Sequence, residues 1–217
     1  MVPRLSLFED IYKDAAVAKL PAGIRMIFIV HGAVDIDGRE FRTGSVWFGE
    51  DAMVCTGGAE GATVWRWELS HGEPNSFEAA DVSTRTKLSA TLTTIPDGEL
   101  LFRGDSVAFP PGGTAFTHRH QGPGIRCMVE GAIRVDTHGR STSYGPGGAW
   151  FETGPDEVFA QADLTRPSRF IRVMVLPRAL LGQSSIRYVR EEDKNKPKSQ
   201  KYEVFVDRPI SFVARSQ

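Results

Sequence analysis

Two histidines in the second half of the chain carry the clearest chemical pattern. His118 and His120 flank Arg119 in a segment that we expect to be a strand. Successive side chains of a strand point to opposite faces, so residues at i and i+2 share a face. Two imidazoles placed in this way can bind one cation, and imidazole suits Zn, Fe, Ni, Cu or Mn. The pattern therefore predicts a divalent transition metal at His118 and His120.

The glycines around this pair have a characteristic spacing. Gly112 precedes His118 with five residues between them, three residues separate His120 from Gly124, and six more lead to Gly131. This spacing resembles the first motif of the cupin superfamily, Gly-x5-His-x-His-x3-Glu-x6-Gly, with four of its five fixed positions matched. The resemblance implies a small β barrel that holds its metal in the interior.

Two ligand positions depart from the family pattern. The carboxylate ligand of the family falls on Gly124, which has no side chain. The second family motif, Gly-x5-Pro-x-Gly-x2-His-x3-Asn, fits best from Gly148 and places Phe159 where the third histidine belongs. The other positions of that motif fall on Gly154, Asp156 and Asp163. The sequence thus offers two of the four ligands that the resemblance implies.

The alternation of side chains along a strand predicts further residues in the barrel interior. If Phe159 points inward, Gln161 also points inward, and we expect both to line a ligand site. A third metal ligand has several sources that the sequence leaves open. They are Gln161, Glu130 beside a predicted hairpin turn, and Glu152 and Asp156 on predicted loops.

Arg126 lies on the same strand face as position 124 and is therefore expected inside the barrel. A buried guanidinium needs an acceptor, because an unpaired charge is costly in an apolar interior. A carboxylate or phosphate of a ligand would bind it with two hydrogen bonds. The alternative is that Arg126 pairs with an internal acid or reaches the rim, and Arg25 holds the equivalent position in an earlier repeat.

Composition excludes several classes of protein. The 217 residues include 26 Lys+Arg and 27 Asp+Glu, so the net charge of −1 gives no reason to expect nucleic acid or an anionic membrane as the main partner. Cys55 and Cys127 do not make a disulfide framework. The longest strongly apolar run is Met26–Val30, and no leader pattern opens the chain, so we expect a cytoplasmic protein with free thiols.

Alternation of apolar and polar residues predicts an all-β chain. Residues 25–41 alternate up to Asp37-Gly38, a strong hairpin signal, and the same period recurs at 44–48, 62–69, 125–136, 146–152 and 169–176. Helix candidates are limited to one or two turns at 7–14 and 178–181. Residues 71–86 are expected to be a polar connection, residues 191–198 an exposed loop, and residues 201–206 a strand.

An internal repeat predicts two copies of one small β domain. Gly23-Ile24-Arg25 recurs as Gly124-Ile125-Arg126, and Gly44-Ser45-Val46-Trp47-Phe48 recurs as Gly147-Gly148-Ala149-Trp150-Phe151. An offset near one hundred residues suits a domain with its own core. The fold predicted is two consecutive small antiparallel β barrels of the double-stranded β-helix or jelly-roll type, a bicupin.

The predicted domains are residues 1–80 as a barrel without the metal motif, 81–180 as the barrel with His-x-His, and 181–217 as a charged loop and a returning strand. That last strand is expected to pair with an earlier sheet or with a partner chain. Open sheet edges favour a homodimer.

Three functions are compatible with the sequence. The first is a metal-dependent enzyme of the dioxygenase, isomerase or lyase class that acts on a small, anionic metabolite. The second is a protein that binds or senses a small molecule without metal or catalysis. The third is a purely structural bicupin. The resemblance does not choose among them, because this barrel hosts many functions.

Overall fold

The fold is built almost entirely of strands. The structure, a computed structural model, describes residues 2–74 and 77–212. Strand makes up 66% of the chain, with almost no helix, which confirms the all-β prediction. The chain divides after Thr91 into two compact units, and each is described by itself.

The first unit contains one sheet in the order β3-β2-β5-β1-β6, with β4 paired to β2. Bulges between Tyr12 and Val17 in β1 and between Ile29 and His31 in β2 interrupt its ladders, and bulges of this kind bend a sheet. The strands are β1 (Pro3–Leu20), β2 (Ile24–Ile36), β3 (Arg39–Arg42), β4 (Val46–Gly49), β5 (Met53–His71) and β6 (Glu78–Thr91).

Two sequence predictions for this unit are wrong. Residues 7–14 are not helical but lie in β1, because their backbone pairs with β5 on one side and with β6 on the other. The stretch 71–86 is not only a connection, since β6 begins at Glu78 and forms an edge of the sheet.

The second unit contains two five-stranded sheets, in the orders β11-β10-β13-β8-β15 and β12-β9-β14-β7-β16. Their facing residues form one apolar core that includes Val107, Met128, Trp150, Val158 and Phe170. The strands are β7 (Leu100–Phe109), β8 (Thr114–His120), β9 (Gly124–Glu130), β10 (Ile133–Thr137), β11 (Arg140–Tyr144), β12 (Ala149–Glu152), β13 (Val158–Ala162), β14 (Ser168–Pro177), β15 (Ile186–Tyr188) and β16 (Lys201–Ile210).

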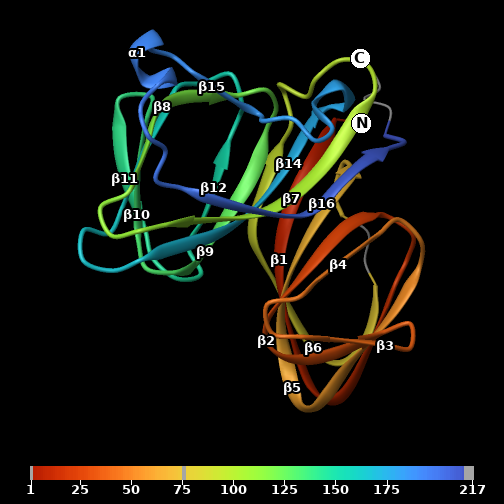
Figure 1. Cartoon of the computed structure of the whole chain (residues 1–217). Coiled ribbons are helices and arrows are strands. Elements are labelled where there is room, and N and C mark those ends of the chain that lie inside the picture. The colour runs from red at the N-terminus through yellow and green to blue at the C-terminus, as the bar shows by residue number, and fades with distance from the viewer. Residues whose placement is uncertain (1, 75–76, 213–217) are drawn as a thin grey trace. The chain divides into compact units, whose positions relative to one another are not determined.

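The C-terminal segment adds one strand to each sheet of this unit. After the short helix η1 (Arg178–Leu180), β15 pairs with β8, so Ile186 lies opposite His120 and Tyr188 opposite His118. The helix α1 (Glu191–Lys194) follows, and β16 then pairs with β7 (Figure 1). The returning strand therefore pairs with an earlier sheet of its own chain, and the expected loop at 191–198 begins with one helical turn.

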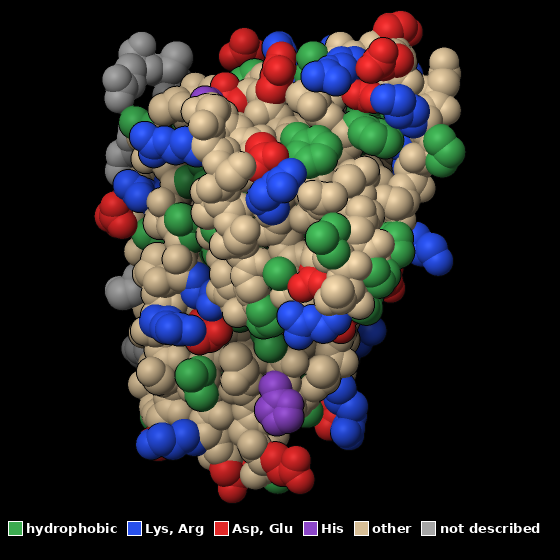
Figure 2. Space-filling model, turned by 90° about the vertical axis from the view of Figure 1, so that its left-hand side faces the viewer, with side chains coloured by type: hydrophobic (Ala, Val, Ile, Leu, Met, Phe, Trp, Pro, Cys, Tyr) green, Lys and Arg blue, Asp and Glu red, His purple; other side chains and the backbone are tan. Residues whose placement is uncertain are grey.

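Basic and acidic side chains are interspersed over the face shown in Figure 2, in keeping with the net charge of −1. Within the part of the chain that the structure describes, no helix has the length and apolar character needed to cross a membrane.

Candidate metal centre

A bulge in β8 turns the two histidines into the core. His118 pairs with Val158 of β13, whereas Ala115 pairs with Ala160. Between these two pairs β8 therefore has one residue more than β13. The extra residue resets the parity of the strand: Ala115 points inward before the bulge, and His118 and His120 point inward after it. Bulges are a recurrent way to aim side chains at functional sites.

The two imidazoles face each other inside the unit. His118 and His120 are 4% and 5% exposed, and their Nε2 atoms lie 3.2 Å apart. His118 Nδ1 lies 2.7 Å from the carbonyl oxygen of Phe116, so this nitrogen carries the proton and donates it. His118 Nε2 is then the unprotonated nitrogen, which accepts a hydrogen bond from His120 Nε2 and has the lone pair that a cation would bind. An outer hydrogen bond of this kind fixes the tautomer of a metal-ligating histidine.

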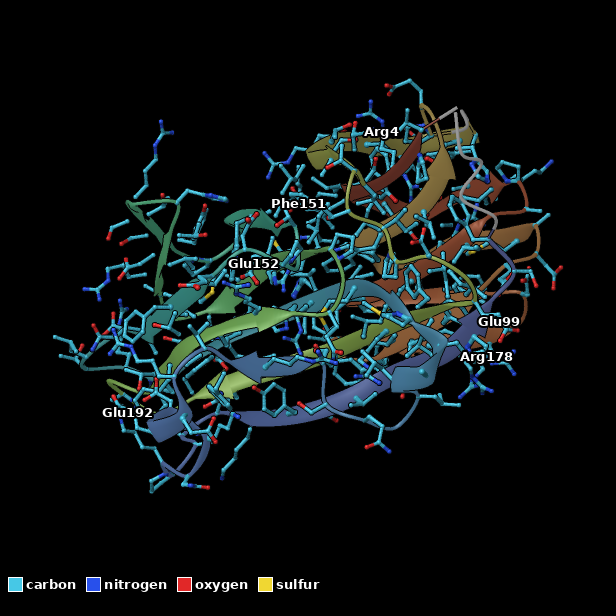
Figure 3. The ribbon with its side chains drawn as sticks, turned by 90° about the horizontal axis from the view of Figure 1, so that it is seen from above. Arg4, Glu99, Phe151, Glu152, Arg178 and Glu192 are labelled. Atoms are coloured by element: carbon cyan, nitrogen blue, oxygen red, sulfur yellow. The ribbon has the colours of Figure 1, made fainter. Side chains whose placement is uncertain are left out.

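Glu152 joins the two histidines in a group of three residues of metal-ligating type. One donor atom each from His118, His120 and Glu152 lies within 4.8 Å of the others, and all three residues are buried. The Oε2 atom of Glu152 is 3.5 Å from His120 Nε2. In Figure 3 Glu152 lies within the body of the second unit, next to Phe151, whereas the exposed Glu192 lies at its periphery.

The carboxylate comes from the strand beside the position that the family motif uses. Glu152, the last residue of β12, pairs directly with Gly124, the first residue of β9. A Cβ atom on Gly124 would lie 2.3 Å from the carbonyl oxygen of Val173, so no side chain fits there. The chain thus replaces a carboxylate on β9 with one from the facing residue of β12.

Two neighbours hold the Glu152 carboxylate. Trp150, two residues earlier on the same face of β12, donates its Nε1–H to Oε1 at 2.9 Å. Arg126 Nη2 lies 2.7 Å from Oε2, but the two groups are not aligned for a hydrogen bond with each other or with any other described residue. Arg126 Nη1 donates to the Gly124 carbonyl oxygen at 2.6 Å. Oε2 is therefore a buried acceptor without a donor.

Burial sets the protonation of the site. It lowers the pKa of His118, an effect that the Glu152 carboxylate opposes. It also lowers the pKa of His120 well below the usual range, with the nearby His118 and Arg126 acting in the same direction. Both imidazoles are then neutral near pH 7, the form that binds metals. Burial lowers the pKa of Arg126 to about 10, so this side chain stays charged.

Beside the triad lies a small internal cavity of about 20 Å³. This is room for roughly one water-sized atom. Arg172 of β14 lines the cavity and binds Asp105 of β7 through Nε and Nη2, at 2.9 and 2.7 Å. Sequence parity could have found Arg172, because it alternates with Phe170 and Met174, but no family motif marks it.

The placement of Phe159 and Gln161 corrects the sequence prediction. The inward side chains of β13 are Val158, Ala160 and Ala162, and the two residues between them are only half-buried. The guanidinium of Arg134 instead lies over the ring of Phe159 in a cation–π contact, with its central carbon 5.8 Å from the ring centre. Val158 opposite His118 takes the inward position, so spacing from the second family motif was wrong by one residue.

The remaining candidates for a third ligand lie apart from the triad. Glu130 pairs with Arg169, and Asp156 pairs with His138, in both cases through side chains that are partly or largely exposed. Glu152 was one of several alternatives in the sequence. The signal that singles it out is its parity with Trp150, whose repeated occurrence marks an inward position.

The first unit has an ion-pair cluster where the second has the triad. Arg25, equivalent to Arg126, donates Nε–H to Glu68 at 2.9 Å, and Arg66 Nη1 lies 2.7 Å from the same carboxylate oxygen. Arg66 also binds Asp10 with two hydrogen bonds. These buried groups neutralise one another. Within the described residues, the only group of three metal-ligand side chains is the one in the second unit.

Solved structures resemble the chain over most of its length. No protein-family model and no curated protein matches the sequence. Oxalate decarboxylase of Lactobacillus farciminis in its formate complex is 11% identical, with a TM-score of 0.65 over 89% of this chain and 82% of that one. Bacillus subtilis oxalate decarboxylase, in a study of its Mn(II) centres, is 10% identical, with a TM-score of 0.62 over 88% and 73%.

AerE from Microcystis aeruginosa, 11% identical, has a TM-score of 0.59 over 81% of this chain and 88% of that one. Oxalate decarboxylase and AerE are both cupin proteins. The chain has the cupin fold. At this level of identity the likeness concerns the fold, so the chemistry of this chain rests on its own residues.

Those residues fit a transition metal. Two imidazole nitrogens and one carboxylate oxygen form a donor set that suits Mn, Fe, Ni, Cu or Zn. Glu152 Oε2 is a buried acceptor that a cation would satisfy, and His118 already has the outer hydrogen bond of a metal ligand. Arg126 competes with a metal for the same oxygen.

Proposed function

We propose that the chain is a bicupin whose second barrel is a metal-dependent enzyme acting on a small, anionic metabolite. The observation that carries the proposal is the convergence of His118, His120 and Glu152 in the core around an unsatisfied carboxylate oxygen. The three residues would hold one divalent transition metal. Such a metal acts as a Lewis acid or as a redox centre toward a bound substrate.

The charges around the site favour an anionic substrate. Arg126 pairs with Glu152, and Arg172 pairs with Asp105, so the described charged groups nearest the triad already balance. A divalent cation would add two positive charges to a buried region, which is costly without compensation. A small carboxylate or similar anion supplies that compensation. Arg126 would orient it from the wall of the site.

The solved neighbours support this class of chemistry. The Bacillus subtilis oxalate decarboxylase has Mn(II) centres, and the Lactobacillus farciminis enzyme was solved with formate. Metal and small carboxylate therefore occur on this fold in those proteins. For the present chain we propose the same two ligand classes, and we leave the substrate itself unnamed.

Turnover by metal-loaded protein tests the proposal. The purified chain is stripped with a chelator, reloaded in turn with Mn(II), Fe(II) and Zn(II), and incubated with a panel of small mono- and dicarboxylic acids under air. We expect consumption of at least one acid that depends on the metal and is lost in Glu152→Gln. Consumption by metal-loaded wild-type protein that is no faster than by the stripped protein or by Glu152→Gln would reject the enzyme.

A second function has one observation in its favour. The Arg126–Glu152 ion pair already supplies the carboxylate with a positive partner, so the fold does not require a metal. In this reading the barrel binds or senses a small molecule without catalysis. Tight binding of an acid by stripped protein, with no turnover by any loaded form, supports this alternative.

Assembly and location stay predictions. A homodimer is proposed because β6 and β16 lie at sheet edges, which proteins usually cover. Cytoplasmic location is proposed because Cys55 and Cys127 are buried and form no disulfide.

A further inference from the structure

A second, larger cavity lies beside the triad, between β16 and the loop that leads into β15. Its volume is about 260 Å³. Arg172, Ile186 and Tyr202 line both this outer cavity and the small one at the triad, so they form the wall between the two. Ser185 lines the outer cavity and also contacts His120, with its Oγ 3.4 Å from Nδ1. One layer of side chains therefore separates the outer cavity from the proposed metal ligands.

Arg172 brings unused hydrogen-bond donors to that wall. The residue is 5% exposed, and it spends Nε and Nη2 on Asp105. Its Nη1 group makes no hydrogen bond to any residue in the described ranges, although guanidinium has five N–H donors. Because Arg172 lines the outer cavity, a donor of its guanidinium that is not used by the protein is available to a ligand that accepts hydrogen bonds. A carboxylate suits a guanidinium best.

Arg103, the other arginine of the cavity, is a useful contrast. It donates Nε–H and Nη2–H to Asp207, and it also binds the carbonyl oxygens of Gln183 and Leu180. All three of its nitrogens are engaged, and they tie the loop before β15 to β16. Arg103 therefore builds the cavity, whereas Arg172 is left to bind a ligand.

The opposite side of the cavity is apolar. Val204 and Tyr202 of β16 are 55% and 45% exposed, and Ile186 faces them from β15. A bulge between Val204 and Val206 alters the course of β16 opposite Asp105. Exposed apolar side chains grouped at a cavity commonly mark a binding site. The ligand should then carry an apolar body as well as its acidic group.

We infer that the outer cavity binds a small carboxylic acid with an apolar body, whose carboxylate accepts hydrogen bonds from Arg172 Nη1. The inference deepens the proposed function, and the role of the cavity rests on that function. The lining of the outer cavity indicates the class of substrate, and its place indicates the side from which the substrate reaches the triad. Tyr202 and Ile186 form the barrier that such an acid would pass. The binding step itself requires no metal.

Benzoate binding to chelator-stripped protein tests the inference. Titration calorimetry with benzoate is compared with benzamide, which has the same body without the charge. Val204→Trp fills the cavity from an exposed position. The control is Val54→Trp, the same substitution at an exposed site of the first unit. We expect benzoate to bind wild-type protein and Val54→Trp alike, and to bind Val204→Trp at least tenfold more weakly. Benzamide should bind wild-type protein at least tenfold more weakly than benzoate.

Arg172→Lys keeps the charge but removes Nη1, and it should also weaken benzoate tenfold or more. No benzoate binding to folded wild-type protein, or equal binding to Val204→Trp, overturns the inference. Metal uptake is measured separately, on portions of the same preparations that are reloaded with Mn(II) or Zn(II). Benzoate binding without metal uptake would reject the metal centre and leave the cavity assignment standing, whereas metal uptake without benzoate binding would do the reverse.

Discussion

Glu152 stands directly opposite Gly124 in the pairing of β12 with β9. The cupin motif expects a carboxylate at the position of Gly124, and this chain presents one from the facing residue. The exchange keeps the acid near His118 and His120 while β9 packs against the backbone of β14. A cross-strand neighbour can thus replace a ligand that the linear motif has lost.

Gly124→Ala tests the closeness of that packing. The new Cβ would lie 2.3 Å from the Val173 carbonyl oxygen and 2.7 Å from Met174 Cγ, so backbone must move. We expect the free energy of unfolding, measured with denaturant, to fall by about 1–3 kcal/mol or more. Gly145→Ala, where a Cβ meets nothing within 4 Å, is the matched control and should be nearly neutral. Equal stability of both variants would show that β9 does not pack closely against the backbone of β14 at Gly124.

Arg126→Met should make the stability of the chain depend on metal. Removing one member of a buried ion pair costs about 3–5 kcal/mol, because Glu152 is left as an uncompensated charge. Mn(II) or Zn(II) would restore a positive partner, so the metal should raise the melting temperature of Arg126→Met more than that of wild-type protein. Arg25→Met removes the corresponding arginine of the first unit but leaves the triad intact, so metal should shift its melting temperature only as much as that of wild-type protein. Equal metal shifts in all three proteins would contradict the site.

Trp150→Phe tests the support of the carboxylate. The change removes the Nε1 donor to Glu152 Oε1 and keeps an aromatic ring against Phe170. Loss of an outer hydrogen bond to a metal ligand typically weakens metal binding by 10–100-fold, so titration should give a dissociation constant at least about tenfold higher. Trp65→Phe, which removes a similar bond to Glu9 in the first unit, should bind metal as wild-type protein does. A Trp150→Phe variant with the same dissociation constant for metal as wild-type protein would show that Trp150 does not support the carboxylate.

Asp163 predicts a specific pH dependence of stability. Its carboxylate accepts the N–H and hydroxyl of Thr165 and the N–H of Arg166, which lowers its pKa to about 2. Since the pKa is lower in the folded than in the unfolded chain, this stabilisation is present above about pH 4 and is lost as the pH falls toward 2. Asp163→Ala should therefore be less stable than wild-type protein at pH 7, and the gap should narrow below pH 4. A gap that stays constant from pH 7 to 3 would refute the assignment.

The sequence could predict the histidine pair because both residues lie on one strand. Spacing within a strand fixes which side chains share a face, and Arg126 was placed inside on the same grounds. Glu152 could not be selected in this way, because its position depends on how β12 pairs with β9. Phe159 and Gln161 were misplaced because the actual register sets Val158, one residue earlier, opposite His118. Ser185 precedes β15 and Tyr202 lies in β16, and no local pattern specifies how these two late strands pair.

The metal content of four proteins tests the central claim most directly. Wild-type protein, His118→Ala/His120→Ala, Glu152→Gln and the control His138→Ala, which alters an exposed histidine, are loaded with Mn(II) or Zn(II), desalted and measured by mass spectrometry. Circular dichroism confirms that each is folded. We expect about one metal ion per chain in wild-type protein and in His138→Ala, and at least a tenfold loss in the other two. A wild-type chain that takes up no metal, or a folded double variant that keeps the full amount, would contradict the account.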